Sequence, residues 1–183
     1  MRRVASFQRT TVDHRRWATV IKKYSKDDQV ALSVWALDCA ERVLPMFERS
    51  MPKDERPGNA LRLGRQWVDT RVFRMPVIRG ASLCAHAAAK AVKADKAACE
   101  AVHAAGQAVA TAHVAQHAYG AACYALKAII ADRPDVAEQL VHDELSWQSA
   151  HLPGHLREEI MSRIVVEPRK KGLFITIEKG HGF

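Results

Sequence analysis

Alanine dominates one long stretch of this chain, from residue 81 to residue 131. Alanine is the best helix former, and its small side chain lets neighbouring helix backbones approach one another closely. The chain has 183 residues, a length typical of one domain. We therefore predict an all-α fold, a multi-helix bundle of about six to eight helices whose core is built from close helix contacts rather than from large side chains.

The longest helical pattern begins at Asp95, which is placed to cap the first turn, and continues to about Ala131, before Pro134. A single helix of about 36 residues would be about 54 Å long, whereas a compact domain of this size spans roughly 40 Å. We therefore expect this pattern to be two helices, with a break near Gly106.

The remaining segments also have amphipathic patterns. Residues 29–49 carry two apolar stripes, which predicts a largely buried helix. Pro45 lacks an amide hydrogen, so a kink or an early end is expected there. Further helices are expected at 13–24, 57–72, 76–93, 134–150 and 153–164. In the helix at 57–72, the residues expected to face inward are Leu61, Gly64, Val68 and Val72.

The two ends of the chain differ from its centre. We divide the chain into a basic N-terminal arm with a short helix (1–26), a helical domain (27–164) and a C-terminal tail (165–183). The sequence LFITI predicts a strand at 173–177, because β-branched and aromatic residues favour strands. Its partner is expected to be 6–12, in a short β ribbon, or a second subunit in a homo-oligomer; a mobile tail is the alternative.

The net charge of +8 is concentrated at the ends of the chain. Residues 1–26 carry eight Lys or Arg against Asp13, whereas residues 27–156 carry fourteen against fifteen Asp or Glu. Residues 56–79 are a local exception, with six arginines against Asp69. A nucleic-acid-binding domain is therefore one alternative function, although the arm contains no recognised DNA- or RNA-binding motif.

Several classes of protein are not indicated by the sequence. It contains no apolar stretch long enough to predict a membrane span and no signal-peptide pattern, so a cytoplasmic protein is expected. The four cysteines lack CxxC spacing and fall within apolar helical patterns, which is typical of small buried residues. No GxSxG elbow or phosphate-binding glycine loop is present, so no catalytic residues are assigned.

His113 and His117 are the sharpest candidate for a metal site. The i, i+4 spacing would place both imidazoles on one face of a helix, from which they could bind a divalent transition metal. The available further ligands are His86, His103, Asp38 and Glu41. A metal-binding helical protein or enzyme is thus a second alternative function, while hydrogen-bonded histidines without a metal are the simpler interpretation.

Asp38, Glu41 and Arg42 form a second polar group, to which His86 is added as a candidate for binding or for a structural role. The spacing of Asp38 and Arg42 allows an ion pair within one helix and leaves Glu41 free. We interpret these residues as a structural cluster that links neighbouring helices or the following segment PKDERP.

Several blocks of the chain together resemble a known family. The blocks WALDCAERVLPMFE, PKDERP, AGQAVATAHVAQHAYGAACYALKAI and LPGHLRE, in this order, are similar to the helical immunity proteins of bacterial polymorphic toxin systems, of the immunity-five-like kind. The resemblance covers about residues 28–164 and brings no catalytic residues with it. It implies a non-catalytic protein that binds and neutralises a cognate toxin, without a cofactor. Because residues 56–79 are basic, we expect the bound surface of the toxin to be acidic or mainly apolar.

Overall fold

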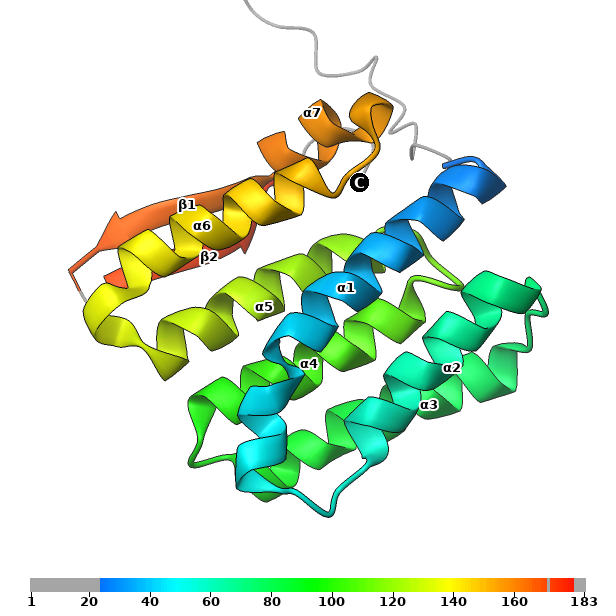
Figure 1. The fold of residues 1–183 in the computed structure, drawn as a ribbon, viewed down its shortest axis with the longest axis horizontal. Helices are drawn as coiled ribbons and strands as arrows, with labels where there is room; N and C mark the ends of the chain where they lie inside the picture. The colour runs from blue at the N-terminus through cyan, green and yellow to red at the C-terminus, as the bar shows by residue number, and fades with distance from the viewer. Residues whose placement is uncertain (1–23, 171, 180–183) are drawn as a thin grey trace, which may run out of the picture.

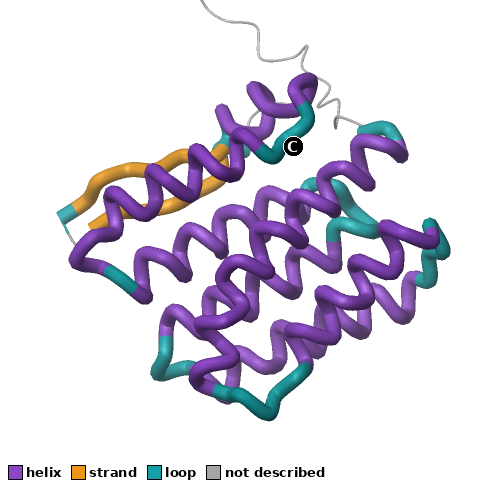
Figure 2. The backbone as a smooth tube through the Cα atoms, in the orientation of Figure 1, coloured by secondary structure: helices purple, strands orange, loops and turns teal. Residues whose placement is uncertain are grey.

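The computed structural model describes residues 24–170 and 172–179, and within these residues the fold is all-α with a small β ribbon. Figures 1 and 2 show the helices side by side, with the ribbon at one side of the molecule. The predicted helical bundle and the predicted ribbon are both confirmed. The helices are α1 (Lys26–Ser50), α2 (Arg56–Thr70), α3 (Met75–Ala88), α4 (Lys96–Ala110), α5 (His117–Asp132), α6 (Ala137–Ala150) and α7 (Gly154–Ser162), with short 3-10 turns at Ala89–Val92 and Pro134–Val136.

Helices α1, α4 and α5 pack against one another and form the centre of the molecule. Helices α2 and α3 cover one side of this centre, and α6 with the ribbon covers the other (Figure 1). Alanines of α4 and α5 are almost completely buried, so the close helix packing predicted from the alanine-rich stretch is confirmed. The largest side chains in this core are Trp35 and Phe47 of α1 and Tyr119 of α5, each at most 1% exposed.

Polar side chains cap the starts of two central helices, one of them the predicted cap at Asp95. Ser25 caps α1: the amide of Asp28 donates to its hydroxyl at 3.0 Å, and the Asp28 carboxylate accepts from the Ser25 amide at 3.2 Å. Asp95 caps α4 by accepting from the Ala98 amide at 3.0 Å. These reciprocal bonds satisfy backbone donors that have no partner inside the helix.

Two helix boundaries in the centre of the molecule differ from the sequence predictions. The early end at Pro45 is wrong, because α1 continues through this proline to Ser50. The break in the alanine-rich stretch lies at residues 111–116, rather than near Gly106. Gly106 instead lies inside α4, where an added Cβ would be 2.6 Å from the His86 ring, so this glycine is explained by helix packing.

The strand predicted at 173–177 exists, but its partner is the segment just before it. Strand β2 (Gly172–Ile177) pairs antiparallel with β1 (Ile164–Arg169), in the register Ile164 to Ile177. Ile175 is 2% exposed and joins the core, which ties the ribbon to α5. The segment first considered as a partner, 6–12, and the helix predicted at 13–24 lie outside the described residues, apart from Tyr24. Self-association through the tail stays a prediction.

Candidate functional site

The connection between α2 and α3 is the most unusual surface in the described part of the chain. Every residue from Arg71 to Val77 is exposed, and four of them are large and apolar. A run of exposed apolar side chains marks a binding surface more often than an ordinary solvated one. The exposed fractions are 60% for Val72, 43% for Phe73, 46% for Met75 and 44% for Val77. We call residues 71–77 the α2–α3 ridge.

Backbone chemistry explains why residues 71–74 of the ridge are not helical, whereas residues 75–77 form the first turn of α3. Arg71 ends α2 in the left-handed conformation (φ 58°), and its amide donates to the Trp67 carbonyl at 2.9 Å. Pro76 lies in the first turn of α3, where its missing amide hydrogen costs nothing. Arg74, the N-cap residue of α3, has an extended backbone (φ −129°, ψ 102°), so the helical conformation resumes only at Met75.

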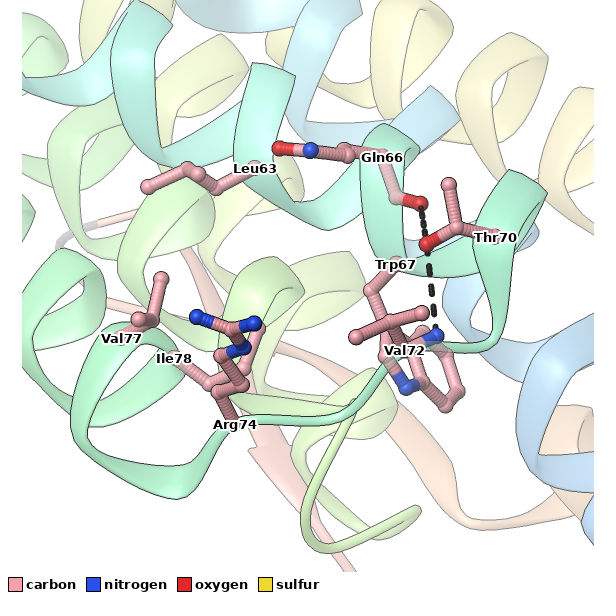
Figure 3. A pocket seen from close by; sticks show the side chains of 8 residues that line it. All are labelled: Leu63, Gln66, Trp67, Thr70, Val72, Arg74, Val77 and Ile78. Carbon is pink, nitrogen blue, oxygen red and sulfur yellow. Dashed lines mark hydrogen bonds between the residues drawn. The ribbon is translucent and has the colours of Figure 1, made fainter.

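Residues of the ridge line two pockets. Val72 and Arg74 line a pocket of about 370 Å³, whereas Arg71, Phe73 and Met75 line a second pocket of about 520 Å³. The side chains of the consecutive residues 71–74 thus alternate between the two pockets. Figure 3 shows the smaller pocket, with Thr70 joined by hydrogen bonds to the Gln66 carbonyl and the Val72 amide.

Trp67 contributes to both pockets. Its side chain comes from the last turn of α2 and is 7% exposed. It belongs to a small second core, together with Ile78 of α3 and Val30 of α1, which lies beneath the ridge. The exposed apolar side chains therefore lie above a packed core, which fixes their position on the surface.

The charge around the ridge is positive and uncompensated. Arg71, Arg74 and Arg79 have no ion pair within residues 24–170 and 172–179. The arginines earlier in this basic segment are occupied: Arg56 binds Asp54, Arg62 binds Glu55, and Arg65 binds Asp38 and Glu41. The free positive charge of residues 56–79 is thus concentrated at the ridge.

Two predicted site residues, His113 and His117, do lie together, but not on one helix. His113 is in the turn between α4 and α5, and His117 is the first residue of α5. Their ring centroids are 5.0 Å apart, and Nδ1 of His117 is 2.7 Å from Oε1 of Gln107. Among the described residues no group of three or more His, Cys, Asp or Glu is placed to hold a metal. The proposed metal site therefore has two protein ligands, where catalytic zinc sites use three.

The predicted ion pair between Asp38 and Arg42 is wrong. Asp38 and Glu41 both bind Arg65 of α2, with the Glu41 contact at 2.7 Å, so these carboxylates link α1 to α2. Arg42 instead reaches α6, where its Nε is 2.8 Å from Oε2 of Glu144. One planar guanidinium has enough donors to bind both carboxylates at once. The prediction of a cluster that links neighbouring helices agrees with these contacts.

His86, the fourth member of that group, belongs to a different set of residues. Its Nδ1 is 2.9 Å from Nδ1 of His103 on α4, so one ring donates and the other accepts. His113 and His117 form a second pair of neighbouring rings, and we call the two pairs together the histidine seam. Burial is the main cause that lowers the pKa of all four imidazoles. Protonation of these four rings is consequently disfavoured relative to an exposed imidazole.

Sequence reasoning missed the ridge itself. Val72 was predicted to face inward as part of α2, but the helix ends at Thr70 and Val72 is exposed. The available signals were Pro76, which disfavours helix before it, and the alternation of arginine and apolar residues from 71 to 75. Trp67, which lines both pockets, carried no signal that separated it from an ordinary core residue.

The fold and this surface together define a helical protein suited to recognition of another macromolecule. The chain belongs to the family described as Imm-5 like putative immunity protein, whose sequence model matches residues 22–155. The family resemblance of the sequence is thereby confirmed. No curated protein and no solved structure matches the chain. Within the described residues, no helix has the length and apolar character needed to cross a membrane.

Proposed function

We propose that this chain is a cytoplasmic immunity protein that neutralises a cognate bacterial toxin by binding it at the α2–α3 ridge, without catalysis and without a cofactor. The observation that carries the proposal is the ridge: four large apolar side chains exposed within seven residues, with Arg71, Arg74 and Arg79 close by in the sequence. Membership of the immunity family supports the general role.

The chemistry of the ridge selects the kind of toxin surface that would fit. Apolar anchors contribute most when they enter pockets that exclude water, and arginine is enriched among such anchors. Three arginines without acidic partners favour a surface that presents carboxylates, because like charges would repel. The partner should therefore present apolar side chains surrounded by Asp or Glu.

A protection assay tests this proposal with a matched pair of variants. The product encoded beside this protein is expressed as the toxin, together with the wild type, Phe73→Asp or Phe174→Asp. The two phenylalanines have similar exposure, 43% and 41%, but Phe174 lies on the ribbon. We expect Phe73→Asp to weaken binding on the order of 30-fold and to abolish protection, as for a central anchor. Phe174→Asp should protect fully.

The contrary outcomes are equally clear. If neither the wild type nor Phe174→Asp binds or protects against the neighbouring product, the toxin-binding role is wrong. If only Phe174→Asp loses binding, the ribbon is the interface and the ridge is not. Binding of the wild type to nucleic acid at low salt, lost steeply as salt rises, would instead favour the nucleic-acid alternative.

A further inference from the structure

The larger of the two pockets beside the ridge has walls from four separate parts of the chain. Its volume of about 520 Å³ lies within the range of pockets that enclose a ligand group. The pocket lies where the start of α1, the end of α2, the ridge and the turn after α4 meet. The lining residues are Lys26, Asp27, Gln29, Val30, Trp67, Arg71, Phe73, Met75, Ala112 and His113.

Hydrogen bonds of a buried amide hold two of these walls together. Gln29 is 8% exposed, and its Nε2 donates to the carbonyls of Thr111 and Ala112, each at 3.0 Å. These bonds join the first turns of α1 to the turn that follows α4. Because the walls are held before any partner arrives, binding there would require little ordering of the protein.

The lining has an apolar floor and a charged rim. Val30, Trp67, Phe73 and Met75 supply the apolar surface, and methionine adapts its shape to different side chains. Lys26 and Arg71 are cationic and, in the part of the chain described, have no acidic partner. Asp27 is the one carboxylate among the lining residues, so the rim keeps a net positive charge.

We propose that this pocket receives an aromatic or large aliphatic side chain from an acidic segment of the partner protein, with neighbouring carboxylates facing Arg71 and Lys26. The inference rests on the proposed function and specifies the recognition element of the partner. Charge disfavours two other occupants. Residues 1–23 of this chain are themselves basic, with seven Lys or Arg against Asp13, and a second copy of the chain carries the same +8.

Short peptides test the pocket without the toxin. The probe is N-acetyl-Asp-Trp-Asp-amide, and the controls are the same peptide with Lys in place of Asp and with Ala in place of Trp. Binding to the full chain is followed by NMR at the Trp67 indole N–H and the Met75 methyl. We expect the acidic tryptophan peptide to shift both signals and to bind about tenfold more tightly than either control.

Two variants assign any binding to the rim. Arg71→Glu should lower the affinity for the acidic peptide about tenfold. Lys93→Glu changes an exposed charge outside the pocket and should leave this affinity unchanged. Equal binding of the acidic and basic peptides, no shift at Trp67 and Met75, or no effect of Arg71→Glu would overturn the inference. Tighter binding in a chain that lacks residues 1–23 would show that this segment occupies the pocket, which also contradicts the inference.

These outcomes separate the inference from the proposed function. If the peptide binds as expected but the neighbouring product is neither bound nor neutralised, the pocket is correct and the immunity role is wrong. If Phe73→Asp abolishes protection while the peptide never binds, the ridge is the interface and the anchor pocket is wrong.

Discussion

The centre of the molecule and the α2–α3 end use apolar residues in opposite ways. In the centre, α4 and α5 contribute alanines that are almost fully buried, so the helices approach closely and leave little room for change. At the α2–α3 end, Val72, Phe73 and Met75 are large and exposed over a small second core. This difference indicates that the small residues of the centre determine how the helices pack. The large exposed residues of the ridge remain accessible to a partner.

The largest expected effect contrasts a buried aromatic residue with an exposed one. Trp35 of α1 is 1% exposed, and its Nε1 donates to the Gln148 carbonyl at 2.9 Å. Trp35→Ala should lower the free energy of unfolding by about 3–5 kcal/mol, because it leaves a cavity and an unpaired carbonyl. Phe73→Ala should change it by less than about 0.5 kcal/mol. Urea denaturation measures the free energy of unfolding of both variants. Similar losses in the two would contradict this contrast between the buried and the exposed aromatic residue.

Two glycines in adjacent helices allow a second comparison between a packed position and an open one. An added Cβ at Gly106 would lie 2.6 Å from the His86 ring, whereas at Gly80 nothing lies within 4 Å. Gly106→Ala should therefore destabilise the protein by about 1–3 kcal/mol through overpacking. Gly80→Ala should stabilise it by about 0.5–1 kcal/mol, since alanine favours the helix. Melting temperatures that moved in the same direction for both variants would contradict this account.

The histidine seam predicts how the stability of the centre depends on pH. Burial lowers the pKa of His86, His103, His113 and His117 below the ordinary value of 6.5. As the pH falls through 6.5, the unfolded chain therefore takes up protons that the folded chain does not, so the free energy of unfolding should decrease. Above this pH both states are neutral at these sites and the effect disappears.

Chemical denaturation between pH 7.5 and pH 5 tests the seam. The carboxylates of Asp28, Asp54 and Asp95, whose pKa values lie below 3.8, stay ionised in this range. A His86→Gln variant should have a smaller pH dependence than the wild type. His142, which is exposed on α6, provides the matched control, and His142→Gln should keep the wild-type dependence. A free energy of unfolding that does not change with pH would show that burial does not lower the pKa of these histidines.

The smallest effect concerns the ion pairs that join α1 to α2. Arg65 bridges Asp38 and Glu41, and all three side chains are partly exposed. Arg65→Gln should lower the free energy of unfolding by about 1 kcal/mol or less, because exposed ion pairs contribute little. Arg62→Gln, at an exposed pair with Glu55, should have almost no effect. A loss of several kcal/mol at Arg65 would mean that these carboxylates do more than connect two helices.

Much of the fold could be predicted because its signals are local. The caps at Ser25 and Asp95, the helix-starting prolines, and the need to divide the alanine-rich pattern all depend on neighbouring residues. The strand at 173–177 was also recognisable from composition. Its pairing with 164–169 was not, because a register depends on which segment the core brings alongside.

The candidate site was largely hidden from sequence reasoning. The spacing of Asp38 and Arg42 suggested one helical ion pair, but Arg65 and Glu144, distant in sequence, became the partners. The ridge was concealed for a similar reason. Val72 continues the apolar pattern of α2, and its exposure follows from the helix ending at Thr70. A periodic pattern alone does not show where a helix stops.

By itself, the sequence determined an all-α chain with alanine-lined contacts, the helix starts, and membership of an immunity family. These follow from helix propensity, capping and the order of several sequence blocks, which are properties of short segments. The tertiary structure alone decided which apolar side chains remained exposed and which arginines kept a free charge. Burial and ion pairing depend on residues far apart in the chain, so they exist only once the helices have packed together.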